Sequence, residues 1–222
     1  MTIRPILFSP AMVRALLERT KTQTRRVLNP QPFPVGGPFY RPCPKTNPFE
    51  WHSVSASGHT CNIQTVRYAP GDLLYVRENF SRVPVTAYRG SEGVFQTEDP
   101  NDRDMACVYS AGWDRSKPGA WKPGIHMPRW ASRLSLKVTD VRVQRVQEIS
   151  EGDAEAEGVS AIGADNAPEE LSDFRSFVWA FHQLWDSLND KRSFGWDMNP
   201  WVVAITFEVH HCNVDQFERA AA

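Results

Sequence analysis

The stretch Lys21-Thr22-Gln23-Thr24-Arg25-Arg26 is the part of this 222-residue sequence that decides the fold. It gathers three cations and two threonines in six residues, directly after a segment expected to be helical. Composition alone favours an exposed edge strand with solvated charges. A segment that follows a helix can, however, direct its side chains into the mouth of a barrel. We therefore expect this cluster to face a ligand pocket.

The residues before the cluster predict a strand and then a helix. Ile3–Phe8 is a short apolar run and is expected to be a strand. Ser9 is a favourable N-cap with Pro10 at the first helical position, and the helix should continue through Ala11–Glu18.

Further along the chain, apolar alternation and capping residues predict two strands, two helices and a final strand. Strands at both ends with helices between them favour one closed sheet and a single domain. Residues 29–68 are rich in Pro, Gly, Ser and Asn, which is typical of a long lid-like loop. Residues 112–130 are expected to be ordered loop. The expected elements are strands at Leu73–Phe80 and Leu134–Val146, helices at Ser150–Gly158 and Pro168–Leu188, a strand at Trp201–Val209 and a frayed end at Asp215–Ala222.

The net charge of -1 argues against a protein that coats long duplex DNA, which would carry a positive excess. It favours a small ligand, a short single strand or a local basic patch.

The first residues lack the apolar core of a signal peptide, and no 18-residue apolar run exists, so we expect no membrane partner and a cytoplasmic location. Free thiols are expected there. A zinc site built from Cys43, His52, His59 and Cys61 matches no standard spacing, so we expect no metal and no cofactor.

Three motifs in order resemble ASCH domains, relatives of the PUA RNA-binding fold. Lys21–Arg26 fits the K-T-x-T-x-R element after the first helix, and Gly71–Glu78 resembles the G-D-x-x-x-V-R-E strand. Ile149–Gly158 resembles the acidic helix after the long strand. The resemblance implies an α+β fold, a small PUA-like β-barrel with flanking helices. It implies one domain over residues 1–222, with insertions at about 30–68 and 85–130.

Residues 5–8 and 121–130 also look like ASCH-like proteins that bacteriophages encode, which implies the host cytoplasm as location. One branch of the family is similar to bacterial amidohydrolases that remove the acetyl group from N4-acetylcytidine. By position, their catalytic residues fall on Lys21, Thr24 and Glu157.

This trio implies a metal-independent mechanism. The Thr24 hydroxyl becomes a nucleophile when a base accepts its proton. Lys21 can be that base when burial or neighbouring cations favour its neutral form. Glu157 orients the lysine or carries a proton to the leaving amine, and Glu155 is a close competitor for the role. In a regular strand, side chains three residues apart point to opposite faces, so Lys21 must lie before the strand or a bulge must intervene.

Other polar residues are candidates for substrate binding, each with a structural alternative. Arg77 and Glu78 could equally form an internal ion pair beneath the pocket. The segment at 126–133 combines cations with an aromatic ring, which suits stacked bases and phosphates but also a loop that clasps the barrel. The candidates are Thr22, Arg26, Arg77, Glu78, His126, Arg129 and Trp130.

The sequence leaves two principal functions open. One is an enzyme that hydrolyses an N4-acylated or otherwise modified cytosine nucleoside. The other is a PUA-like module that reads RNA or a modified base, in service of a phage against host defence. Ribonuclease action is a third alternative, although no His pair or carboxylate cluster supports it. Each implies a nucleoside or a short single-stranded nucleic acid as partner, and the oligomeric state stays open.

Overall fold

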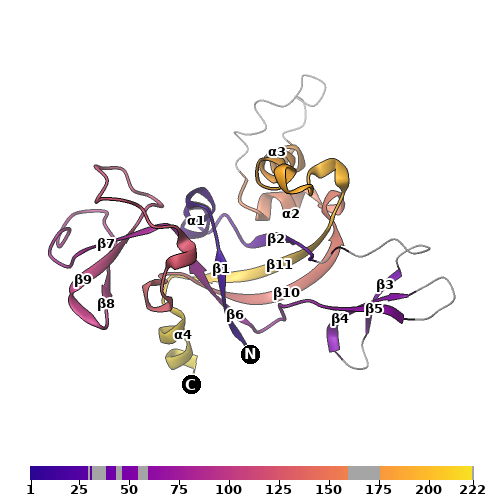
Figure 1. Cartoon of the computed structure of the whole chain (residues 1–222), viewed down its shortest axis with the longest axis horizontal. Helices are drawn as coiled ribbons and strands as arrows, with labels where there is room; N and C mark the ends of the chain where they lie inside the picture. The colour runs from indigo at the N-terminus through magenta and orange to yellow at the C-terminus, as the bar shows by residue number, and fades with distance from the viewer. Residues whose placement is uncertain (30, 32–38, 44–46, 55–59, 160–175, 222) are drawn as a thin grey trace. The chain divides into compact units, whose positions relative to one another are not determined.

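A computed structural model describes residues 1–29, 31, 39–43, 47–54, 60–159 and 176–221, with an α+β fold (Figure 1). The chain divides into two compact units. Unit 1 comprises residues 1–22, 71–137 and 207–222, and unit 2 comprises residues 23–70 and 138–206. Within the described residues the strands form one five-stranded and two three-stranded sheets, with orders β1-β6-β10-β11-β2, β3-β4-β5 and β7-β9-β8.

In unit 1 the chain begins as the sequence predicts. β1 (Ile3–Leu7) pairs in parallel with β6 (Leu73–Arg77), which pairs antiparallel with the start of β10 (Ser135–Arg145). α1 (Pro10–Leu17) follows β1, and the Ser9 hydroxyl caps it by accepting from the Met12 N–H, which confirms the expected cap. The α1 side chains Val13 and Leu16 are fully buried, so the helix is anchored by its apolar face.

The remainder of unit 1 forms a second sheet. β7 (Phe80–Pro84) and β8 (Thr97–Asp99) both pair antiparallel with β9 (Asp102–Tyr109). The segment after β9 contains two short 3-10 turns, Gly124–His126 and Arg129–Ala131. Its buried side chains form a core with β7 and β9, namely Phe80, Cys107, Tyr109, Met127 and Ala131.

In unit 2, β2 (Gln23–Val27) pairs antiparallel with β11 (Trp201–His210). α2 (Glu151–Ala156) and α3 (Phe177–Asn189) lie over the same side of these strands (Figure 1). The core beneath the helices contains Val146, Ile149, Ala154, Phe181, Trp185 and Val202.

Three expectations were wrong. The described strands form separate sheets and not the expected closed barrel. The lid-like loop at 29–68 contains a sheet of β3 (Phe39–Cys43), β4 (Asn47–Val54) and β5 (Thr60–Thr65). The expected frayed end is helix α4 (Val214–Ala221), because Val214 is fully buried against Leu73 and Tyr75. The first part of the expected helix at 168–188 lies outside the described residues. None of the described helices has the length and hydropathy to cross a membrane.

Candidate functional site

The polar residues of β2 divide between the two faces of the strand. β2 pairs regularly with β11, with Thr24 opposite Ile205 and Arg25 opposite Ala204. Since side chains alternate along a strand, Gln23 and Arg25 project from one face and Thr24 and Arg26 from the other.

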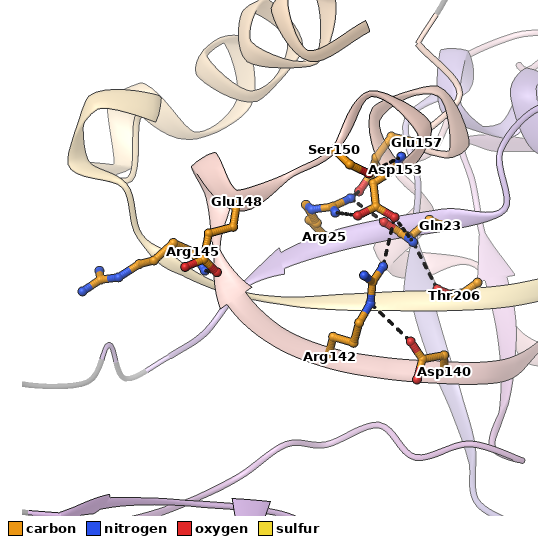
Figure 2. A network of polar contacts seen from close by, with 10 residues as sticks. All are labelled: Gln23, Arg25, Asp140, Arg142, Arg145, Glu148, Ser150, Asp153, Glu157 and Thr206. Atoms are coloured by element: carbon orange, nitrogen blue, oxygen red, sulfur yellow. Dashed lines mark hydrogen bonds and ion pairs between the residues drawn. The ribbon is translucent and has the colours of Figure 1, made fainter. Parts of the chain in front are cut away.

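The first face carries a buried ion-pair network with α2, which Figure 2 shows. The Arg25 side chain is 0% exposed, and its guanidinium contacts Glu157 and Asp153, each over 3.1 Å. It also donates to the Gln23 Oε1 atom over 2.6 Å. A buried guanidinium requires such acceptors, because desolvation of the charge is otherwise costly. We name Gln23, Arg25, Asp153 and Glu157 the β2–α2 cluster.

Further donors surround Asp153 at the rim of the cluster. Arg142 donates to its Oδ1 atom over 3.0 Å and also contacts Asp140, while the Gln23 amide donates to it over 3.1 Å (Figure 2). Burial alone would raise the pKa of Asp153. The hydrogen bonds from Arg142 and Gln23, with the charges of Arg142 and Arg25, outweigh it and lower that pKa. Asp153 is therefore ionised at neutral pH.

Local sequence explains why two acids face β2. The Ser150 hydroxyl accepts from the Asp153 N–H and starts α2, as the sequence predicts. Residues four apart lie on one side of a helix, so Asp153 and Glu157 both point to β2. Glu155 points elsewhere and is exposed.

The second face of β2 borders a cavity of about 260 Å³ in unit 2. Arg26 lines it together with Val203, its partner on β11. The cavity thus combines two cationic side chains, an aromatic ring, an amide and four apolar side chains. Its lining residues are Arg26, Val27, Leu28, Asn29, Val66, Arg67, Tyr68 and Val203. We name it the Arg26 cavity.

Arg26 stands in a mixed electrostatic environment. Burial lowers the pKa of its guanidinium, while the charges of Tyr68 and Glu157 raise it and Arg192 lowers it further. An arginine nevertheless stays charged in a protein, so this side chain brings a cation to the cavity wall.

The three expected catalytic residues are all buried. Lys21 is 0% exposed, Thr24 2% and Glu157 4%. Lys21 lies before β2, where its N–H donates to the Ala15 carbonyl over 3.1 Å, so the alternation of β2 does not fix its side chain. Thr24 lies on the face of the Arg26 cavity, whereas Glu157 contacts Arg25 on the opposite face.

The expected pair of Arg77 and Glu78 has different partners. Glu78 is 1% exposed and accepts two hydrogen bonds from Arg133, over 2.8 and 3.0 Å. Burial raises the pKa of Glu78, and the hydrogen bond and charge of Arg133 partly oppose that rise. Arg77 instead donates to the Ile125 carbonyl and lies over the Tyr75 ring.

The remaining binding candidates lie in unit 1. His126 and Trp130 line a second cavity, whereas Arg129 pairs with Asp215. Thr22 is exposed, and its carbonyl accepts from the Phe207 N–H. None of these four residues lines the Arg26 cavity.

The sequence predicts Arg25 only as a cation beside Lys21 and Asp153 only as an acid in the first turn of a helix, and it predicts no role for Tyr68. A signal for the first two was present, because Gln23 and Arg25 share one strand face and Asp153 and Glu157 share one helix face. No sequence pattern indicates a role for Tyr68, because tertiary folding alone brings this residue to the Arg26 cavity.

No family model, no curated protein and no solved structure matches this chain. Within the described residues, no group of three His, Cys, Asp or Glu side chains could hold a metal ion. The four residues weighed as zinc ligands have side chains outside the described set.

Proposed function

We propose that this protein binds a nucleobase or nucleoside of the cytosine type in the Arg26 cavity. The observation that carries the proposal is the joint placement of the Arg26 guanidinium, the Tyr68 ring and four apolar side chains around one small cavity. The cavity is slightly smaller than known ligand pockets of about 300 Å³ and upward, and its polar lining groups can fix the orientation of a ligand, as in those pockets.

The chemistry of the lining suits a pyrimidine. Tyr68 offers a ring on which a base can stack. Arg26 offers parallel N–H donors that match the adjacent O2 and N3 acceptors of cytosine. Asn29 adds an amide whose oxygen can accept a hydrogen bond from the exocyclic amine of cytosine.

The placement of the motifs supports an ASCH-type, PUA-like fold as part of the proposal. The Lys21–Arg26 motif leads into β2, the Gly71–Glu78 motif contains β6, and the acidic motif forms α2 after the long strand β10. This order of motifs and elements supports the proposed fold.

Amidohydrolysis of an N4-acylated cytosine is the second candidate, favoured by the burial of Lys21 and Thr24. Thr24 is two residues from Arg26 on the same strand face, so their Cα atoms are roughly 7 Å apart. The chain itself keeps Lys21 and Thr24 within about 11 Å. A hydroxyl so placed could attack an acyl group attached to a base that Arg26 holds.

The proposed hydrolysis needs only the two side chains, the amide and water. The Thr24 oxygen bonds to the amide carbon while Lys21 accepts the hydroxyl proton. Collapse of the tetrahedral intermediate breaks the C–N bond, and the proton passes from Lys21 to the departing N4 amine. Water then hydrolyses the acyl-threonine ester. Glu157 contacts Arg25 on the other face of β2. In this scheme it is therefore a positioning residue that holds the strand carrying Thr24.

One experiment separates the two candidates. N4-acetylcytidine is added to the pure protein, and both the heat of binding and the release of acetate are recorded. Heat of binding without release of acetate supports a binding protein. Release of acetate by the wild-type protein, but not by the Lys21→Ala and Thr24→Val proteins, supports an amidohydrolase. If millimolar N4-acetylcytidine gives no heat of binding and no acetate, both candidate functions are contradicted.

A further inference from the structure

We infer that unit 1 carries a second, separate binding site, which takes a nucleotide through its base and its phosphate. The site is a cavity of about 260 Å³ lined by Phe80, Arg82, Asp99, Lys122, His126, Pro128 and Trp130. Its lining residues are all different from those of the Arg26 cavity. The inference goes beyond the proposed function and does not depend on it.

Backbone pairing fixes one wall of this cavity. The Lys122 N–H donates to the Phe80 carbonyl over 2.7 Å, and the Phe80 N–H donates to the Lys122 carbonyl over 3.1 Å. This reciprocal pair makes a β-bridge that holds Lys122 beside β7. The Lys122 backbone is therefore anchored, although its side chain is exposed.

A close approach at Gly124 fixes the next wall. A Cβ atom at this position would lie 3.0 to 3.1 Å from the Glu78 backbone, so only glycine fits without a shift. The Gly124 N–H also donates to the Asn79 Oδ1 atom, and the Glu78 N–H contacts the Met127 sulfur. The two 3-10 turns that follow present His126, Pro128 and Trp130 to the cavity from this anchored start.

The floor of the cavity is aromatic. Phe80 is 3% exposed, and the half-buried Trp130 packs on the same core as Phe80 and Met127. An indole ring held in this way offers a rigid surface on which a base can stack.

Charged side chains lie around the cavity. Arg82 pairs with the lining residue Asp99 over 2.7 Å and with Asp102 over 3.4 Å, so its charge is offset by these carboxylates. Lys122 forms no ion pair within the described part of the chain, so its ammonium group can meet an anionic group of a ligand. The exposed His126 ring adds a further nitrogen donor. A stacking surface with an ammonium and an imidazole at its rim matches a base linked to a phosphate.

The test uses uridine 5′-monophosphate and uridine, because the N3–H of uracil does not match the donors of Arg26. Calorimetry should give at least tenfold tighter binding for the monophosphate, since its phosphate can accept a charge-assisted hydrogen bond that uridine lacks. Lys122→Ala should remove that advantage. Lys117→Ala, which changes an exposed lysine outside the cavity, should keep it, and so should Arg26→Ala.

The outcomes are distinct for the two sites. Equal affinity for uridine and its monophosphate would overturn the second site, as would unchanged affinity after Lys122→Ala. Loss of binding in Arg26→Ala but not in Lys122→Ala would also overturn it and assign the ligand to unit 2.

Trp130→Leu, with circular dichroism as a check of folding, should weaken both ligands alike. A uridine trinucleotide that binds more tightly than the monophosphate would identify the phosphate source as a strand, whereas weaker binding would identify the free nucleotide.

Discussion

Arg25 and Glu157 form an ion pair of 3.1 Å in which the two side chains are only 0% and 3% exposed. This contact holds the end of α2 to β2 through charge, in addition to the apolar packing of Ala154 in the core. It also determines which face of β2 is available to a ligand. Because Arg25 is directed to α2, Thr24 and Arg26 are left for the face that borders the cavity.

The first prediction concerns the stability of this ion pair. Glu157→Ala should lower the free energy of unfolding by about 3 kcal/mol, because it leaves the buried Arg25 charge with one carboxylate partner. Glu155→Ala changes an exposed acid two residues away and should alter stability by no more than about 0.5 kcal/mol. Urea denaturation measures both, and equal effects of the two substitutions would refute the structural role of Glu157.

The second prediction concerns pH. The pKa of Asp153 in the folded state is lowered from its ordinary value of 3.8, so ionised Asp153 contributes stability above about that pH. The contribution is lost as pH falls through the lowered folded pKa. Urea denaturation of wild-type and Asp153→Asn proteins should show a difference in stability at pH 7 that shrinks below pH 3.8. The exposed Asp197→Asn serves as control, and a gap that stays constant with pH would argue against the ionic role of Asp153.

The third prediction contrasts two glycines. Gly124→Ala should destabilise the protein by about 1–3 kcal/mol, since the new methyl group would press on the Glu78 backbone. Gly152 lies in α2, and nothing lies within 4 Å of the place that an alanine methyl group would take there, so Gly152→Ala should be neutral or stabilising by up to about 0.5 kcal/mol. Thermal unfolding of both variants checks this, and a Gly124→Ala protein as stable as wild type would contradict the close approach.

The elements with local signals were predictable from the sequence. Ser9 and Ser150 are N-caps as expected, and the alternation of residues 134–146 becomes β10, Ser135–Arg145. The helix at the C-terminus was missed because its stability comes from tertiary burial of Val214, which no local pattern reveals. The strands within residues 29–68 were missed because turn-forming residues are frequent there.

The candidate site was predictable only in part. Of the Lys21–Arg26 motif, Arg26 lines the Arg26 cavity. Sequence spacing could not show that Arg25 would take Glu157 as its partner, or that Arg133 would pair with Glu78 from 55 residues away. These pairings depend on which elements pack together, and side-chain type alone does not determine that.

The most direct test of the proposed function is calorimetric titration of cytidine into wild-type, Arg26→Ala and Arg89→Ala proteins. Arg89 is an exposed arginine in unit 1 and provides the matched control. Loss of the paired hydrogen bonds from a charged donor should weaken cytidine binding roughly tenfold or more in Arg26→Ala and leave Arg89→Ala unchanged. Cytidine affinity that is the same in all three proteins would contradict the assignment of the ligand to the Arg26 cavity.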